Sequence, residues 1–340
     1  MTSSSLILLV GYAGKGNFGD EMMIEAAAGL LSGSTVRIVE GGIPMGKLLS
    51  LLWQAERIVV CGGHVIAPRH GSYLRVLIPA LLMGKAIRFV SIEMSGMPRR
   101  RLTRLLQWLV LAKADISVRT AESAAILRQV MPWKATRQVV DLFYLHPAFD
   151  GSPGRGALPA VDRFRLEPGP AQPQGPCHLI VLPRSFGRGQ GYNDNQNAAR
   201  ITDAIRHVAL NREIHKITVS PSANVDDAEP CFRHISNEWS NRVELTLVPN
   251  SAPLTLDPGT VVITNRLHLA KACLYWGIEV ILVSYDRKTE APELVGHTGS
   301  ILQLDGSVLP AADLAISPAL LDARRHLSLH AIQRQIQVST

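Results

Sequence analysis

The sequence predicts an α/β fold made of two successive doubly wound domains. Its 340 residues exceed one ordinary core, because a domain typically holds about 150 residues. Short apolar runs alternate with helical stretches, which is typical of a parallel sheet that is covered on both faces. A break rich in Gly and Pro at 151–176 interrupts this alternation. It divides a first domain at 1–150 from a second domain at 177–317.

The first domain is expected to alternate strands and helices. The run Leu6–Val10 is wholly apolar, as in a strand buried on both faces, and the stretch Asp20–Leu31 after it is helical in character. Ligands of such sheets bind at the carboxyl ends of the strands. Further strands are expected at Val36–Glu40, Arg57–Cys61, Ile87–Ser91 and Ile116–Val118, with a helix at Leu102–Ala112.

The break at 151–176 contains 11 Gly or Pro among 26 residues. Such a stretch favours neither a helix nor a central strand and indicates an interdomain linker. After the linker the alternation resumes, and the tail at 318–340 is expected to hold a terminal helix, Pro318–Gln337. Strands are expected at His178–Leu182, Lys216–Ser220, Val243–Val248, Val261–Thr264 and Glu279–Val283, with helices at Asn195–Asn211, Asp226–Ser240 and Arg266–Trp276.

Composition limits the class of protein. Hydrophobic residues make up 46% and charged residues 19%, which excludes a disordered chain or a small disulfide scaffold. The four cysteines are far apart and form no CxxC pair, so we expect neither a structural zinc site nor disulfides. This cysteine usage is typical of a protein in a reducing compartment. Aromatic residues make up only 5% and do not interleave with basic ones, which argues against nucleic acid as a partner.

The net charge is concentrated in the first domain. Residues 1–150 hold 17 Lys and Arg against 10 Asp and Glu, whereas residues 151–340 hold 18 of each. No run is long and apolar enough to span a membrane, and no signal peptide is evident, so we expect a cytoplasmic protein. The basic run Met97–Arg104 favours a solvated helix start, with contact with the inner face of an anionic membrane as the alternative.

A glycine-rich loop follows the first expected strand. Gly14, Gly16 and Gly19 match the GxGxxG pattern of dinucleotide sites. The glycines start late after the strand, however, and Asp20 and Glu21 would repel a pyrophosphate at the helix start. We expect either a tight turn in which Asp20 caps the helix or a cleft surface on which acidic and amide groups hold sugar hydroxyls. The residues of that surface are Asn17, Asp20 and Glu21.

A second glycine pair ends another expected strand. Gly62 and Gly63 follow Cys61, and glycine there allows a ligand or another backbone to approach closely. His64 then either faces the cleft or simply ends the strand.

The segment 261–283 combines a buried strand with a helix start. Asn265 is a suitable N-cap, so Arg266 and His268 would share the first helical turn. Free backbone N–H groups there attract an anion, the Arg266 guanidinium suits a carboxylate or phosphate, and His268 can move a proton near neutral pH. The alternative is a surface arginine and a core histidine.

Several motifs occur together in one order. They are GxGNxGDE after the first strand, the Gly62–Gly63 pair, Ser117–Arg119 (SVR), Asn265–His268 (NRLH) and the later YDxK. Over roughly residues 6–290 the chain thereby resembles the polysaccharide pyruvyl transferase family. The resemblance implies two Rossmann-like halves facing a cleft, as in the B-type glycosyltransferase fold. It also implies transfer of a pyruvyl group from phosphoenolpyruvate to a sugar or lipid-linked oligosaccharide, forming a ketal.

The resemblance also implies roles for individual residues. Arg266 and His268 match the family's Arg-x-His, and Arg184 resembles its other donor-binding arginine, with Asn265 beside them; this places the donor on the second domain. The first domain would bind the acceptor through Asn17, Asp20, Glu21, His64 and Arg119. The sequence departs from the family pattern at His64 and at Thr120, which puts the identity of the acceptor in doubt.

The implied reaction uses fixed cations and one proton donor. Arg184, Arg266 and a helix N-terminus would hold the phosphate and carboxylate of phosphoenolpyruvate, and His268 would protonate its methylene carbon. No metal-ligand cluster is evident, so we expect neither a metal nor another cofactor. Two alternatives stay open: a B-type glycosyltransferase that uses a nucleotide sugar, and a catalytically degenerate, sugar-binding member of the family.

Overall fold

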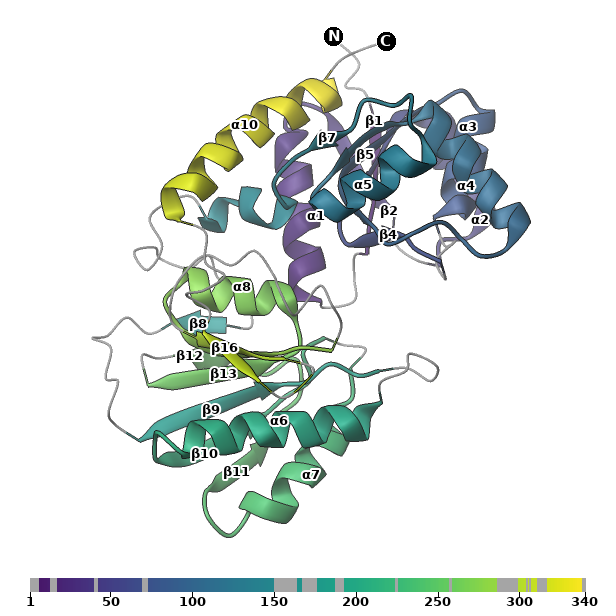
Figure 1. Cartoon of the computed structure of the whole chain (residues 1–340). Coiled ribbons are helices and arrows are strands. Elements are labelled where there is room, and N and C mark those ends of the chain that lie inside the picture. Colours follow the sequence, from purple (N-terminus) through teal and green to yellow (C-terminus); the bar gives the residue numbers. More distant parts are fainter. Residues whose placement is uncertain are drawn as a thin grey trace. The chain divides into compact units, whose positions relative to one another are not determined.

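The expected fold class is confirmed: the protein contains two mostly parallel sheets with helices packed on them (Figure 1). The structure is a computed structural model, which describes residues 6–12, 17–39, 42–68, 73–149, 164–166, 176–186, 193–223, 226–256, 259–285, 299–303, 305, 307–310 and 317–337. The chain forms two compact units. Unit 1 comprises residues 1–14, 20–147 and 322–340, and unit 2 comprises 15–19 and 148–321.

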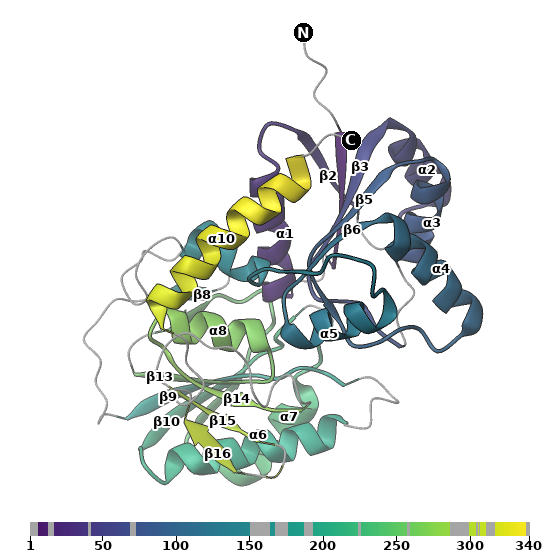
Figure 2. The same ribbon diagram turned by 45° about the horizontal axis from the view of Figure 1, so that its top comes forward.

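The sheet of unit 1 is parallel, with the strand order β2-β1-β3-β5-β6-β7 and the short β4 paired to β5. Helices α2, α3 and α4 cover one face, and α1 and α10 lie on the other (Figure 2). The strands are β1 (Leu6–Val10), β2 (Thr35–Val39), β3 (Ala55–Cys61), β4 (His64–Ile66), β5 (Ala86–Met94), β6 (Asp115–Val118) and β7 (Arg137–Gln138). The helices are α1 (Phe18–Leu30), α2 (Met45–Gln54), α3 (Leu74–Leu82), α4 (Arg101–Lys113), α5 (Ala121–Val130) and α10 (Pro318–Gln337), with a 3-10 turn at Leu142–Leu145.

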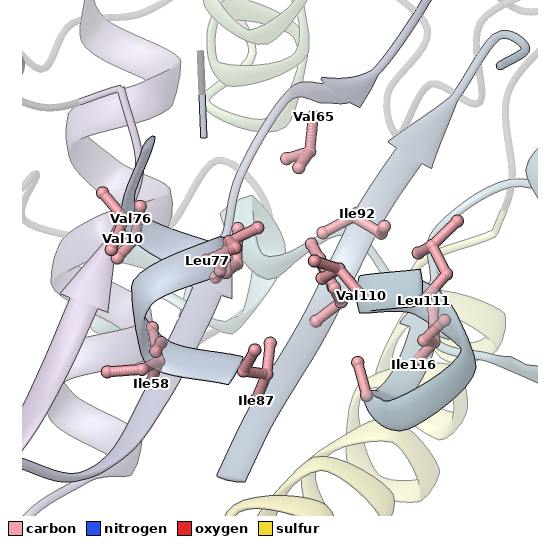
Figure 3. Close-up of a cluster of buried hydrophobic side chains, with 14 of the residues drawn as sticks. Val10, Ile58, Val65, Val76, Leu77, Ile87, Ile92, Val110, Leu111 and Ile116 are labelled. Carbon is pink, nitrogen blue, oxygen red and sulfur yellow. The ribbon is translucent and has the colours of Figure 1, made fainter. Parts of the chain in front are cut away.

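The core of unit 1 lies between its sheet and helices α2 to α5 (Figure 3). Val10 and Ile58 from neighbouring strands face Leu77 of α3, and all three are buried. Because both faces of the sheet are covered, its central strands are nearly continuous apolar runs, which is why the sequence predicts them well.

The C-terminal helix α10 begins at the end of unit 2, and from Asp322 onward it belongs to unit 1. The Ser328 hydroxyl accepts a hydrogen bond from the Val140 amide (2.8 Å), and the Gln335 side-chain amide donates to the Phe89 carbonyl (3.1 Å). The buried Arg57 guanidinium donates to the Ile336 carbonyl at the end of the helix. Unit 1 is therefore assembled from both ends of the chain.

The sheet of unit 2 has the order β11-β10-β9-β13-β14-β15-β16, and only the β15–β16 pair is antiparallel. Helices α6 and α7 lie on one face and α8 on the other (Figure 1). The strands are β9 (Cys177–Leu182), β10 (Ile214–Val219), β11 (Glu244–Leu247), β13 (Thr260–Thr264), β14 (Glu279–Val283), β15 (Gly299–Leu302) and β16 (Val308–Pro310). The helices are α6 (Asp194–Ala209), α7 (Glu229–Trp239) and α8 (Leu267–Tyr275); β8 (Phe164–Leu166) and β12 (Leu254–Leu256) form a separate pair, and Pro147–Phe149 is a 3-10 turn.

Three helices were not expected from the sequence: α2, α3 and α5. Helix α3 contains Pro79, and neither α2 nor α3 has a side-chain N-cap, so the usual start signals are absent. Most of the expected linker, 151–176, lies outside the described residues; within it the structure describes β8 and Pro176.

Candidate functional site

In unit 2, polar and aromatic side chains follow three neighbouring strands. Strands β9, β13 and β14 are adjacent and parallel, so their carboxyl ends meet at one edge of the sheet. Arg184 follows β9, Arg266 follows β13 and Tyr285 follows β14. This edge is where ligands bind in open α/β sheets.

Arg266 is already paired with a carboxylate. Its guanidinium forms an ion pair with Asp226 and donates to the Ser222 hydroxyl (2.9 Å). Asp226 in turn accepts from Ser222 and from the Ser185 amide (3.1 Å), so this carboxylate is held firmly. The charge of Arg266 is therefore neutralised by its own protein, which weakens it as a binding group for an anion.

Arg184 is held by rings instead. Its guanidinium lies over the Tyr285 ring (5.0 Å to the centroid) and near the Phe186 ring (5.6 Å), and it donates to the Tyr285 hydroxyl. The two rings meet edge to face at 5.0 Å. Within the described part of the chain, no carboxylate contacts Arg184. Cation–π contacts fix its position without neutralising its charge.

Helix α8 begins one residue later than expected, so the prediction that Asn265 caps it is wrong. Arg266 occupies the N-cap position, and its amide donates to the Thr264 hydroxyl (3.1 Å). The buried Asn265 amide instead donates to the Val283 carbonyl (2.9 Å), which ties β13 to β14. Its Oδ1 is buried with no hydrogen-bond partner among the described residues.

His268 lies in the first turn of α8, as expected, and packs against a glycine from the first loop. A Cβ atom added at Gly19 would come within 2.4 Å of the His268 Cβ and Nδ1 atoms. Both residues belong to unit 2, and so does the half-buried Asn17. Gly19 is thus required by close approach to His268, a role that the GxGxxG pattern did not indicate.

In unit 1, Asp20 lies beside the second glycine pair. A Cβ atom at Gly63 would be 3.2 Å from the Asp20 Oδ1 atom, and Gly62 adopts a φ of +86°. Burial, with a contribution from the Asp20 charge, raises the pKa of the Cys61 thiol to about 12. The structure therefore brings the acid of the first motif to the glycines of the second.

Arg119 is buried at the end of β6 and binds two carboxylates, Glu93 and Asp141, the latter at 3.0 Å. Burial alone lowers the pKa of this guanidinium, but the charges of Asp141 and Glu93 outweigh it, so the pKa is raised. Thr120, where the family pattern differs, caps α5 by accepting from the Ser123 amide (3.1 Å).

The remaining expected residues are less informative. Glu21 is half-buried in the first turn of α1, and His64 lies in β4, but its side chain is outside the described part of the structure. Among the described residues no group of three or more His, Cys, Asp or Glu could hold a metal ion, and no helix could cross a membrane. Sequence reasoning missed Ser222, Asp226 and Phe186; Tyr285 was visible only as part of YDxK.

No protein-family model matches the chain, and no curated protein matches it. Solved structures do match. MnaA from S. aureus, in a co-structure with UDP, has a TM-score of 0.51 at 8% identity, over 98% of this chain and 88% of that one. UDP-GlcNAc 2-epimerase from Methanocaldococcus jannaschii has a TM-score of 0.48 at 11% identity, over 86% of this chain and 89% of that one. UDP-GlcNAc 2-epimerase from Neisseria meningitidis, bound to UDP-GlcNAc, has a TM-score of 0.45 at 9% identity, over 86% and 88%.

The match to MnaA, which spans almost the whole of this chain, bears out the two Rossmann-like, glycosyltransferase-B-like units. It also corrects the expected function: that structure is a co-structure with UDP, and the expectation of pyruvyl transfer from phosphoenolpyruvate is wrong. The pairing of Arg266 with Asp226 gives a physical reason, because it removes one of the two cations that phosphoenolpyruvate required. Membership of the pyruvyl transferase family is not tested by these matches and stays a prediction.

Proposed function

We propose that this chain is an enzyme that binds a nucleotide sugar on unit 2, with the diphosphate against Arg184 and the N-terminus of α8. The observation that carries the proposal is the state of Arg184. It is a fixed cation at the carboxyl edge of the sheet, held by Tyr285 and Phe186, with no contacting carboxylate in the described residues. A diphosphate is the anion that such a cation and a helix start bind together.

The fold supports the class of ligand. MnaA, whose architecture matches almost the whole of this chain, is solved with UDP. In this chain the diphosphate would face α8, where the first backbone N–H groups have no partner within the helix. A uridine diphosphate sugar is therefore the first ligand to test.

His268 is our candidate for proton transfer to or from the bound sugar phosphate. It lies in the first helical turn, beside the proposed diphosphate position. Its packing against Gly19 fixes the first side-chain atoms, which favours one orientation of the imidazole ring. The sugar could be transferred to an acceptor or converted into another sugar that stays attached to UDP. Measuring free UDP after the reaction distinguishes the two, because only transfer releases it. The residues proposed for the acceptor are Asn17, Asp20, Glu21 and His64.

Thermal unfolding with UDP, UDP-GlcNAc and phosphoenolpyruvate tests the proposal. A ligand at one hundred times its Kd stabilises by about 2.7 kcal/mol, so UDP or UDP-GlcNAc should raise the midpoint and phosphoenolpyruvate should not. Arg184→Ala should abolish the rise. Arg206→Ala is the matched control, because this arginine is exposed on α6 and pairs with Asp203 and Glu238.

A second variant separates the two arginines. Asp226→Asn removes the carboxylate that neutralises Arg266, so it should strengthen UDP binding, by about tenfold if the freed charge contributes ~1.4 kcal/mol. The proposal is contradicted if neither uridine compound raises the midpoint, or if Arg184→Ala retains the full rise.

A further inference from the structure

The outward face of α4 carries large apolar side chains, unlike that of an ordinary surface helix. Leu102 (68% exposed), Leu105, Trp108 and Leu109 point away from unit 1, whereas Gln107 is buried on the inward face with Val110 and Leu111. The Gln107 side-chain nitrogen has no hydrogen-bond partner among the described residues. A helix that served only to cover the sheet would place leucines inward and glutamine outward.

The apolar surface continues beyond the helix. Trp133, in the turn after α5, is 61% exposed, and its ring meets the Trp108 ring edge to face at 5.8 Å. Helix α4 lies beside α3 in the layer that also contains α2 (Figure 2). We call this surface, made of Leu102, Leu105, Trp108, Leu109 and Trp133, the α4 patch. Contiguous exposed apolar surface of this kind marks a site of interaction.

Positive charge borders the α4 patch. The segment 94–114 contains no Asp or Glu. Arg99, Arg100 and Arg101 are exposed at the start of α4, and no carboxylate contacts them in the part of the chain that the structure describes. Cations are unfavourable at a helix N-terminus, so these arginines do not serve the stability of the helix.

We propose that the α4 patch docks the protein on the surface of an anionic membrane. Leucine and tryptophan side chains would enter the boundary between headgroups and acyl chains, while the arginines bind lipid phosphates. Basic side chains close to such a surface are attracted by its negative potential. The arginines favour an anionic membrane over a second copy of this chain, because two copies docked face to face would bring two arginine clusters together. The inference is independent of the nucleotide-sugar proposal.

Co-sedimentation with vesicles tests the docking. We expect the full chain to sediment with vesicles of phosphatidylcholine and phosphatidylglycerol at low salt, less at high salt, and not with phosphatidylcholine alone. Leu102→Gln with Leu105→Gln should weaken the apparent affinity about tenfold or more. Arg100→Gln with Arg101→Gln should weaken it and reduce its salt dependence.

Matched variants outside the α4 patch test whether removing any exposed leucine or arginine would reduce vesicle binding. Leu210→Gln changes an 81% exposed leucine, and Arg206→Gln changes an exposed arginine, both in unit 2; neither should alter sedimentation. The proposal is overturned if wild-type protein stays in the supernatant with anionic vesicles, if neutral vesicles bind it equally, or if the leucine variant binds as well as the wild type. It is also overturned if sedimentation velocity shows a dimer that the leucine variant abolishes, because the patch then joins two copies.

Discussion

Arg119 in unit 1 and Arg184 in unit 2 both lie just beyond the carboxyl end of a parallel strand, β6 and β9 respectively. Arg119 is buried between Glu93 and Asp141. Arg184 lies on two aromatic rings, and no carboxylate contacts it among the described residues. Both arginines follow a parallel strand, yet the charge of Arg119 is neutralised by buried carboxylates, whereas that of Arg184 is not paired with a carboxylate in the described residues. A position at the end of a strand makes an arginine a candidate for ligand binding, but its contacts determine whether its charge is available.

The largest expected effect comes from breaking the buried cluster. Arg119→Ala leaves Glu93 and Asp141 as uncompensated buried carboxylates, which should cost about 3–5 kcal/mol of unfolding free energy. Urea unfolding measures it. Arg137→Ala is the control in the same unit, because its pair with Asp115 is exposed at 3.6 Å and should contribute about 0–1 kcal/mol. If both variants lose the same small amount, Arg119 is not a structural arginine and the contrast with Arg184 fails.

The fold was predictable because its central strands are buried on both faces. β1, β3, β9, β13 and β14 each contain three or more consecutive apolar residues, and each lies where the sequence predicted a strand within a few residues. The sequence did not predict helices α2 and α3, because no side chain caps the start of either helix.

The candidate site was predictable only in part, for a different reason. The sequence predicted Arg184, Arg266 and His268 as site residues because they follow strand ends that a parallel sheet brings together. Their partners are distant in sequence: Asp226 lies 40 residues before Arg266, and Glu93 lies 26 before Arg119. No local pattern encodes a contact across that separation, so the neutralised state of Arg266 required the structure. The expected donor, phosphoenolpyruvate, came from the family resemblance, and Arg266 was assigned to it as a free cation.

An intermediate effect is expected at Gly19, which lies in the first turn of α1 and packs against His268. Gly19→Ala forces a methyl group against the backbone-borne Cβ of His268, at 2.4 Å, which should cost about 1–3 kcal/mol and weaken the ligand-dependent rise in midpoint. Gly29→Ala lies in the same helix with open space around it. That control should be neutral or stabilise by up to about 1 kcal/mol. Equal behaviour of the two variants would contradict the close approach.

The smallest expected effect is a pH dependence that compares buried thiols in the two units. Burial and then the Asp20 charge raise the pKa of Cys61 to about 12, and burial alone raises the pKa of Cys231 to about 12. Above pH 9 an unfolded chain releases these thiol protons while the folded protein keeps them. The free energy of unfolding therefore falls as the pH rises from about 9 toward 12.

Cys61→Ala measures how much the Cys61 thiol contributes to this decrease in the free energy of unfolding. At pH 10, about one unit above the ordinary thiol value, Cys61 accounts for ~1.4 kcal/mol of lost stability, so the variant should lose that much less than wild type between pH 8 and 10. Cys231→Ala should behave alike. Asp20→Asn should lower the pKa of Cys61 alone, because Asp20 contributes to the shift only in unit 1. Urea midpoints at each pH measure all four proteins. An Asp20→Asn profile that matches wild type would show that the Asp20 charge does not reach Cys61 and would contradict this prediction.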